Sequence, residues 1–276
     1  RIAASFGGGG TPTQYMGTFP ALLAAIGKVD MGFGAGQGVK CYHSEHLYGE
    51  LWHRAFIVAV DSPHVNYILS CGHNGDAAAG VAGIWRHADA RVRGMKRVQV
   101  EPHQSVTGGV AAEWIPIKPK TDAAFLYGVI HRIVIEQNWR NICDVERLEQ
   151  DSNSPYLIGP NGFWMRDPDT EKPLIFDLDK KESRPFDEEI NNPGMEGEYI
   201  VSGIEIGSDE DRWVHKEIRV KTSFQQFVDH MKEYTPEWAE KHSDVPAATI
   251  RKVADEFVEN ACIGQTIEVE GEKMPY

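Results

Sequence analysis

Short apolar runs and helix-like segments alternate along the first half of the chain. Three of the runs are strand candidates: Tyr67–Ser70, Val98–Glu101 and Trp114–Ile117. The small residues of Ala77–Trp85 are expected to open a helix after the first run. After the third, Thr121-Asp122 is expected to cap a long amphipathic helix that runs through Trp139. The order strand, helix, strand, strand, helix is typical of a parallel sheet covered by helices.

Five further segments with recognisable patterns precede Tyr67. They are an interior strand at Arg1–Phe6, a short helix at Gln14–Ile26 that ends at Gly27, a glycine-punctuated loop at Gly32–Gly38, a helix at Leu47–Trp52 and an apolar run at Phe56–Val60. These segments extend the α/β pattern to the start of the chain.

The pattern changes in residues 151–221. Proline, glycine, asparagine and acidic residues dominate this part, and its apolar runs, such as Pro173–Phe176, are short. We expect an irregular insertion with little core of its own.

Helical periodicity returns in residues 222–276. Phe224–Tyr234 is followed by a strong helix start at Thr235-Pro236, and Asp244-Val245-Pro246 opens a further helix. The apolar face of that helix consists of Ile250, Val253, Ala254 and Phe257. We therefore expect a helical hairpin packed on the sheet, and three parts in the chain: an α/β segment over 1–150, the insertion over 151–221 and the hairpin over 222–276.

Composition narrows the possible functions. The chain has 276 residues, of which 41% are hydrophobic and 25% charged, the ordinary range for a globular domain with a sizeable core. Its formal net charge of −13 argues against a nucleic-acid surface, because phosphate binding needs clustered lysine and arginine. Apolar stretches such as Phe125–Ile135 are too interrupted to cross a bilayer.

The two ends of the chain lack the usual features of termini. The chain opens with the apolar run Arg1–Phe6 instead of an initiator methionine, and it stops at Met274-Pro275-Tyr276 without a polar tail. We expect a piece of a longer protein, and a periplasmic or a cytoplasmic location, or association with a membrane through partner subunits, stays open.

The four cysteines are widely scattered, at Cys41, Cys71, Cys143 and Cys262. Their spacing forms neither an iron–sulfur run nor a zinc pair. Each is most simply a buried small side chain or a free thiol.

Polar turns follow the three strand candidates. Gly72 and Asn74 lie beyond the first strand, where α/β proteins bind nucleotides, although such a turn is often only a turn. Glu101 ends the second strand, as a carboxylate that binds a ribose diol does; the alternative is a carboxylate that faces water. Asp122 follows the third strand and either accepts a hydrogen bond from a base or caps the helix with Thr121.

In this order, the three turns resemble the molybdopterin oxidoreductases of the dimethyl sulfoxide reductase family. There, one strand ends in a Gly-x-Asn turn, a second ends in an acidic residue and proline, and a third leads to Pro-Gly-Thr-Asp-x-Ala-Leu at a helix start. The corresponding segments here are Leu69–Asn74, Val100–Pro102 and Trp114–Ala124. The resemblance to the large catalytic subunit covers residues 1–139 and the hairpin from Tyr234 to Ala261.

The resemblance implies a bis(molybdopterin guanine dinucleotide) cofactor, of which this segment would hold one dinucleotide. Asn74, in the same turn as Gly72, is expected near the phosphate or sugar. Glu101 is expected at the ribose, and Asp122, preceded by Thr121, at the guanine.

Two residues depart from the family pattern. Glu101 replaces the more usual aspartate, and its longer side chain still reaches a diol. Lys120 stands where the family has glycine, which is tolerable only if the turn needs no positive backbone angle there.

The resemblance also implies a metal ligand in the loop after the first helix. Cys41 is the preferred molybdenum ligand, because a thiolate is a soft donor suited to a sulfur-rich metal centre. Ser44 is the second choice, and a Cys41 that only packs is the alternative. His43 or His46 is expected on the substrate side of the metal as a proton donor, against the alternative of a surface or core histidine.

The implied activity is catalysis at molybdenum or tungsten, in which an oxygen atom or two electrons pass to or from a small substrate, as in anaerobic respiration. Electrons would leave through iron–sulfur centres, including a 4Fe–4S cluster outside this segment, toward an iron–sulfur partner subunit. The isolated segment is expected to be inactive.

Three alternatives to this activity stay open. The same family resemblance permits non-redox chemistry, as in a hydratase or a transhydroxylase. A structural relative such as the large peripheral subunit of NADH dehydrogenases would keep the fold without the metal. A nicotinamide-dependent dehydrogenase is disfavoured, because no strand is followed by Gly-x-Gly-x-x-Gly at a helix start.

Overall fold

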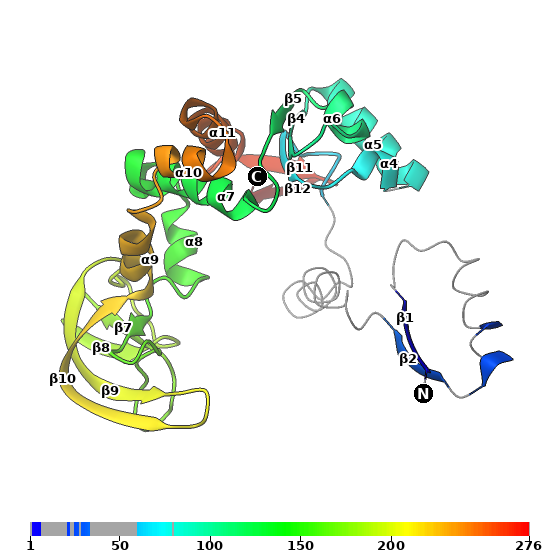
Figure 1. Cartoon of the computed structure of the whole chain (residues 1–276). Helices are drawn as coiled ribbons and strands as arrows, with labels where there is room; N and C mark the ends of the chain where they lie inside the picture. Colours follow the sequence, from blue (N-terminus) through cyan, green and yellow to red (C-terminus); the bar gives the residue numbers. More distant parts are fainter. Residues whose placement is uncertain are drawn as a thin grey trace. The chain divides into compact units, whose positions relative to one another are not determined.

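The computed structural model describes residues 2–6, 21–22, 25–27, 29–33, 60–78 and 80–275. The chain divides into two compact units, each made of two stretches of sequence. Figure 1 labels their helices and strands and colours them from the N-terminus to the C-terminus. The first unit comprises Arg1–Asn66 and Asn74–Lys96, and the second comprises Tyr67–His73 and Arg97–Tyr276.

The first unit contains a short parallel pair of strands. Strand β1 (Ile2–Phe6) pairs with β2 (Val29–Phe33), and the expected N-terminal strand is thereby confirmed. Ala21, Leu22, Ala25 and Ile26 are helical, and Gly27 follows with a φ of 109°, as a glycine that ends a helix does. The expected loop at Gly32–Gly38 is wrong at its start, because Gly32 pairs with Ser5 inside β2.

The described part of the first unit also contains two helices close to the end of β3 (Tyr67–Cys71) in the sequence. They are α4 (Gly75–Ala78) and α5 (Gly80–Arg93), which confirm the helix expected from Ala77. The Arg93 guanidinium donates hydrogen bonds to the carbonyls of Ser62 (2.9 Å) and Val65 (2.8 Å), and so joins the end of α5 to the segment before β3. The helix expected at Leu47–Trp52 and most of the run expected at Phe56–Val60 lie outside the described residues.

The second unit is built on a three-stranded sheet in the order β3-β4-β5. The strands are β3 (Tyr67–Cys71), β4 (Lys96–Glu101) and β5 (Glu113–Pro116), so all three strand candidates are confirmed. β4 and β5 are parallel. β3 runs the same way as β4, because hydrogen bonds join their starts (Lys96 N–H to Asn66 O) and their ends (Gly72 N–H to Val100 O).

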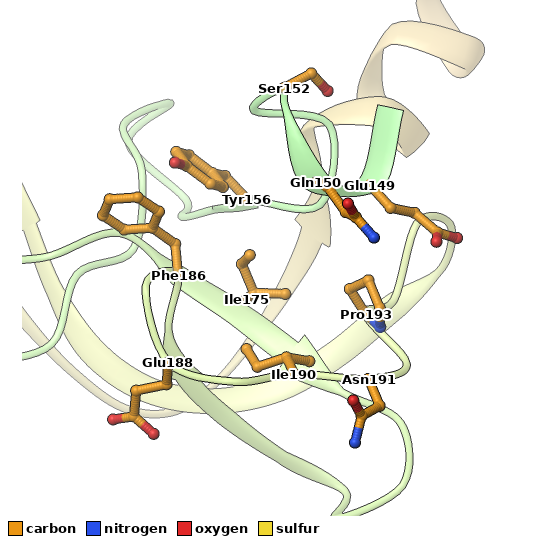
Figure 2. Close-up of a pocket in the computed structure, with 10 residues that line it drawn as sticks. All are labelled: Glu149, Gln150, Ser152, Tyr156, Ile175, Phe186, Glu188, Ile190, Asn191 and Pro193. Atoms are coloured by element: carbon orange, nitrogen blue, oxygen red, sulfur yellow. The ribbon is translucent and has the colours of Figure 1, made fainter. Parts of the chain in front are cut away.

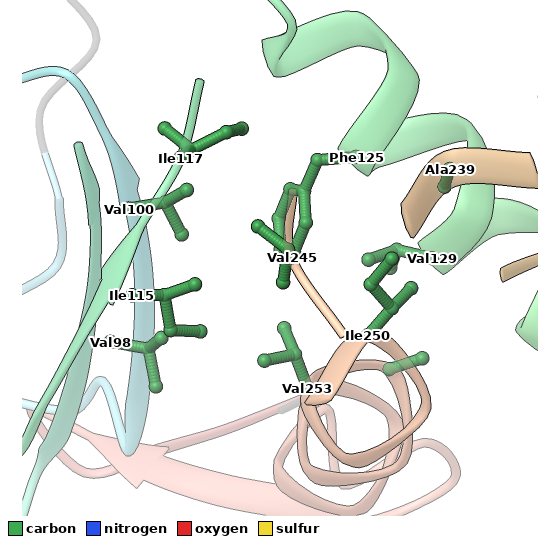
Figure 3. Packing of buried hydrophobic residues seen from close by; sticks show 11 residues of the cluster. Val98, Val100, Ile115, Ile117, Phe125, Val129, Ala239, Val245, Ile250 and Val253 are labelled. Carbon is green, nitrogen blue, oxygen red and sulfur yellow. The ribbon is translucent and has the colours of Figure 1, made fainter. Parts of the chain in front are cut away.

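Helices cover one face of this sheet. They are α7 (Asp122–His131), α10 (Pro236–Ser243) and α11 (Ala247–Asn260). Figure 3 shows the valines and isoleucines of β4 and of the β5 end facing side chains of α7 and α11 across a single core. Val98, Phe125 and Ile250 in this core are fully buried, and each contributes about 1.5–3 kcal/mol of transfer free energy.

The helical hairpin is confirmed. Thr235 caps α10 by accepting a hydrogen bond from Trp238 N–H (3.1 Å), with Pro236 in the first helical turn. Of the apolar face expected on α11, Ile250, Val253 and Ala254 are buried, whereas Phe257 is 46% exposed. The hairpin is preceded by α9 (Ser223–Met231) and followed by the strand pair β11 (Thr266–Val269) and β12 (Glu272–Pro275).

The long helix expected to run from Asp122 through Trp139 is wrong in its second half. The α-helix ends at His131, a π-helical turn covers Arg132–Glu136, and a short 3-10 turn covers Trp139–Asn141. Arg132 forms an ion pair with Asp255 of α11, at 2.8 Å, which holds the wider turn in place. Asn138, with a φ of 62°, then reverses the chain.

The expectation of an irregular insertion with little core is also corrected. Residues 151–221 form two sheets, one in the order β6-β10-β9 and one of β7 and β8. Their strands are β6 (Leu157–Ile158), β7 (Leu174–Asp177), β8 (Glu182–Pro185), β9 (Glu198–Ile206) and β10 (Arg212–Thr222). They enclose their own core of Leu157, Met165, Leu174, Val201 and Val220.

A second small cluster connects this β-rich segment to the helices of the same unit. Trp139, Met195, Phe224 and Val228 pack together, with α8 (Val145–Gln150) contributing Val145 and Leu148 at its edge. None of the helices in the described ranges is long and apolar enough to span a membrane.

Candidate functional site

Each of the three polar turns singled out in the sequence follows the carboxyl end of a strand in the β3-β4-β5 sheet. At the end of β3, Gly72 has a φ of 64°, a conformation that favours glycine, and its N–H donates to Val100 O at 2.9 Å. A Cβ built on Gly72 would meet no atom of the described residues within 4 Å.

Asn74 follows Gly72 by two residues and belongs to the first unit. Its carbonyl accepts a hydrogen bond from Ala77 N–H (3.2 Å), so it immediately precedes the first turn of α4. Its placement toward the polar residues of the second unit stays a prediction.

Glu101 lies at the end of β4 and is 4% exposed. Its Oε1 accepts a hydrogen bond from Ser105 N–H (2.7 Å) and its Oε2 accepts one from Gln99 Nε2 (3.0 Å). Ser105 in turn caps α6 (Val106–Val110), because its hydroxyl accepts from Gly108 N–H at 3.2 Å.

The charge of Glu101 follows from these contacts. Burial alone would raise the pKa of this carboxyl, but the hydrogen bonds from Ser105 and Gln99, together with nearby His103, outweigh burial and hold the pKa below its ordinary value. Glu101 is thus an ionised acceptor at neutral pH, the state that binds a diol. The alternative of a carboxylate that faces water is wrong, because the side chain is buried.

Thr121 and Asp122 lie where β5 leads into α7. The Thr121 hydroxyl donates to Lys118 O (2.6 Å) and makes no capping bond, so the expectation that Thr121 caps the helix with its side chain is wrong. Asp122 is the first residue of α7, where its charge is favourable for the helix dipole.

Cys71, at the end of β3, is influenced by the charge of Asp122 at the start of α7. Burial, together with the negative charge of Asp122, raises the pKa of the Cys71 thiol to about 11. Cys71 therefore stays a neutral thiol at physiological pH. It is half-buried and free, in agreement with the second of the two expectations for the cysteines, a free thiol.

The turn before Asp122 does require a positive backbone angle. Lys120 has a φ of 68°, so the condition under which the family glycine is dispensable is not met. The lysine instead adopts the left-handed conformation at a cost of about 1–2 kcal/mol relative to the right-handed one.

Sequence reasoning missed Gln99. This side chain is fully buried in β4, and its Nε2 donates to His73 O (3.2 Å) as well as to Glu101. The available signal was a polar residue between Val98 and Val100 in an otherwise apolar strand.

The predicted metal ligands Cys41 and Ser44 and the predicted proton donors His43 and His46 lie outside the described residues. Within the ranges that are described, no group of three or more His, Cys, Asp or Glu side chains is arranged to hold a metal ion. The assignments in this loop stay predictions.

A separate cavity of about 230 Å³ lies beside β7 in the β-rich segment (Figure 2). It is lined by Glu149, Gln150, Ser152, Tyr156, Ile175, Phe186, Glu188, Ile190, Asn191 and Pro193. None of the residues predicted from the sequence to bind a cofactor lines it, so it is distinct from the sheet edge.

Fold and site together define an α/β protein with its polar turns at the carboxyl edge of a parallel sheet, the place where proteins of this class bind ligands. No family model matches the chain. A sulfite dehydrogenase subunit of Allochromatium vinosum is 30% identical over 175 residues, which are 60% of this chain and 17% of that protein. The thiosulfate reductase molybdopterin-containing subunit PhsA of Salmonella typhimurium is 24% identical over 276 residues, which are 100% of this chain and 23% of that protein.

These relatives confirm the resemblance drawn from the three turns: the chain is a relative of the molybdopterin oxidoreductases of the dimethyl sulfoxide reductase family. It spans less than a quarter of the length of either curated relative. Among solved structures, acetylene hydratase from Pelobacter acetylenicus aligns with a TM-score of 0.48 and 16% identity, over 87% of this chain and 23% of that one.

Proposed function

We propose that the chain is the part of a molybdopterin oxidoreductase that holds one guanine dinucleotide of a bis(molybdopterin guanine dinucleotide) cofactor. The observation that carries the proposal is the buried carboxylate of Glu101 at the end of β4, in a sheet whose strands run the same way, so that the turn at Gly72 follows the end of one neighbouring strand and Asp122 follows the other. A carboxylate at such a strand end accepts hydrogen bonds from a ribose diol.

The residues fit the group they would hold. Among the described residues nothing lies within 4 Å of a Cβ built on Gly72, which leaves room for a phosphate or sugar at the backbone, and none of them gives the Oε1 of buried Gln99 a hydrogen-bond partner. Glu101 would bind the ribose and Asp122 the guanine amino group, with Thr121 in the same turn. Asn74 would bind the phosphate or sugar.

The cofactor would supply a molybdenum or tungsten centre for two-electron or oxygen-atom transfer. Cys41, with Ser44 as second choice, would be the protein ligand to the metal, and His43 or His46 would carry a proton on the substrate side. The names of the two curated relatives favour an inorganic sulfur compound as the small substrate. Electrons would pass to an iron–sulfur partner through a 4Fe–4S cluster of the whole protein.

The proposal is tested by metal and nucleotide analysis of the full-length protein. We expect molybdenum or tungsten, and guanosine monophosphate released by acid, in a ratio of two nucleotides to one metal. Glu101→Gln and Asp122→Asn should each lower the nucleotide retained by about tenfold, the loss of about 1.4 kcal/mol of binding. Glu259→Gln, at an exposed position on α11, is the matched control and should retain the wild-type amount. A wild-type protein without the metal and the nucleotide would refute the proposal.

A further inference from the structure

Gln99 has an unusual position for an amide side chain. It is 0% exposed and lies between Val98 and Val100, whose side chains point to the opposite face of the sheet and into the helical core. Burying an amide in a protein interior is unfavourable unless it is hydrogen-bonded. Its hydrogen bonds therefore indicate what the side chain does.

Both donors of the Gln99 amide are used. Nε2 donates to His73 O at 3.2 Å and to Glu101 Oε2 at 3.0 Å. His73 belongs to the turn after β3 and Glu101 ends β4. One amide group thus joins the two turns that, in the proposed function, contact the same dinucleotide.

The orientation of this amide is determined by its neighbours. A carbonyl and a carboxylate are acceptors only, so the NH₂ group must face them, and a flipped amide would set oxygen against oxygen. Gln99 Oε1 consequently points away and has no partner among the described residues. A buried, unpaired oxygen is unfavourable by about 1–3 kcal/mol, which a valine or leucine in the same strand would avoid.

Local stability alone does not account for this arrangement. Glu101 already receives hydrogen bonds from Ser105, which sets α6, and the turn after β3 is already joined to β4 by Gly72 N–H and Val100 O. The additional contribution of Gln99 is directional: it fixes the orientation of the Glu101 carboxylate and ties that orientation to the His73 carbonyl.

We infer that Gln99 is a positioning residue for the dinucleotide, which holds the Glu101 carboxylate and the turn Cys71–His73 in one fixed relation. The inference rests on the proposed function, because the ligand is the one proposed there. Gln99 acts through Glu101, so its effect on binding depends on the carboxylate at position 101.

The test is a double-mutant cycle in the full-length protein, with acid-released guanosine monophosphate per polypeptide as the readout. Gln99→Met keeps the length of the side chain and removes both donors. We expect it to lower the nucleotide retained after dialysis by about tenfold in the wild-type background. In the Glu101→Gln background, where the carboxylate is absent, Gln99→Met should cause less than a twofold further loss. Glu259→Gln combined with Gln99→Met serves as the additive control.

Each outcome has one meaning. Equal retention by wild type and Gln99→Met would overturn the inference and leave the proposed function intact. The same fold loss in both backgrounds would also overturn it, because a merely structural role does not depend on Glu101. No nucleotide in wild type would refute the proposed function itself. If Gln99→Met does not fold, Gln99→Asn, which keeps an amide but is one methylene too short to span both acceptors, takes its place in the same cycle.

Discussion

Two buried glutamates, one in each sheet region of the second unit, differ in where their hydrogen bonds come from. Glu205 in β9 is 0% exposed and accepts from Asn161 N–H (3.1 Å), Asn161 Nδ2 (2.9 Å), Phe163 N–H (3.1 Å) and His215 Nε2 (2.8 Å). Among the described residues, the Glu101 carboxylate in β4 accepts hydrogen bonds from Gln99 and Ser105, two and four residues away along the chain.

The difference separates a structural carboxylate from a candidate binding one. Four donors occupy the acceptor positions of Glu205, and they bring together segments more than forty residues apart. These hydrogen bonds account for the burial of Glu205 without any ligand. Within the described part of the chain, the Glu101 carboxylate makes local hydrogen bonds, next to an amide oxygen without a partner and a glycine turn with space around it. A buried carboxylate with a shifted pKa in such surroundings is a candidate for ligand binding.

The largest effect should come from removing the structural carboxylate. Glu205→Ala leaves Asn161, Phe163 and His215 without their buried acceptor, and we expect a loss of about 3–5 kcal/mol in the free energy of unfolding, measured by denaturant titration. Glu210→Ala, at an exposed turn, should change it by less than about 0.5 kcal/mol. A small effect of Glu205→Ala would mean that Glu205 has no structural role, and the distinction between Glu205 and Glu101 would then be wrong.

The second-largest loss of stability should come from filling the space beside Glu205. A Cβ on Gly159 would lie 2.3 Å from Glu205 Cδ, so Gly159→Ala must displace the buried carboxylate and should destabilise the fold by about 2–3 kcal/mol. Gly109→Ala, where a Cβ meets nothing within 4 Å, is the control and should be neutral or slightly stabilising. Thermal unfolding of the two variants side by side distinguishes a spatial requirement from a general intolerance of alanine.

The candidate binding carboxylate should show a pH dependence. Because the pKa of Glu101 in the folded protein lies below the ordinary value of 4.5, its ionised form stabilises the fold above pH 4.5, and this contribution is lost as the pH falls through the folded-state pKa. Glu101→Gln should therefore be about 1–3 kcal/mol less stable than wild type at pH 7. The gap should narrow at pH 3. A gap that stays constant between pH 7 and pH 3 would mean that the charge of Glu101 is not what its neighbours stabilise.

The smallest expected effect concerns the turn before Asp122. Lys120→Gly relieves the left-handed conformation of Lys120 and should stabilise the fold by up to about 1 kcal/mol, less the extra entropy that glycine adds to the unfolded chain. Lys118→Gly, at a position without a positive φ, should be destabilising by a similar amount. Equal effects of the two substitutions would show that the backbone at Lys120 is not strained.

The same contrast explains which parts of the molecule could be predicted from the sequence. Local patterns predict two of the strands and one helix cap, and the structure confirms all three: Tyr67–Ser70, Val98–Glu101 and the cap at Thr235. The core of residues 151–221 could not be predicted, because it depends on strand pairings and on Glu205 contacts between distant segments that look irregular one by one. The early end of α7 depends on Asp255, more than a hundred residues later.

The site was predicted in part for the same reason. Residue types and order indicated Gly72, Glu101 and Asp122, whereas the link between the turns through Gln99 and the His73 carbonyl involves a backbone group that no sequence motif marks. The positive φ at Lys120 was recognised as a condition in the sequence, but only the structure shows that the turn adopts it.

Hydrogen–deuterium exchange of the full-length protein, with and without its cofactor, shows most directly whether the carboxyl edge of the β3-β4-β5 sheet binds a dinucleotide. If the sheet edge holds a dinucleotide, the amides of residues 71–74, 101–105 and 118–122 should exchange more slowly in the cofactor-bound protein. The amides of residues 159–163, which Glu205 already fixes, should be unchanged. Equal exchange at the three turns with and without the cofactor would contradict the proposed dinucleotide site.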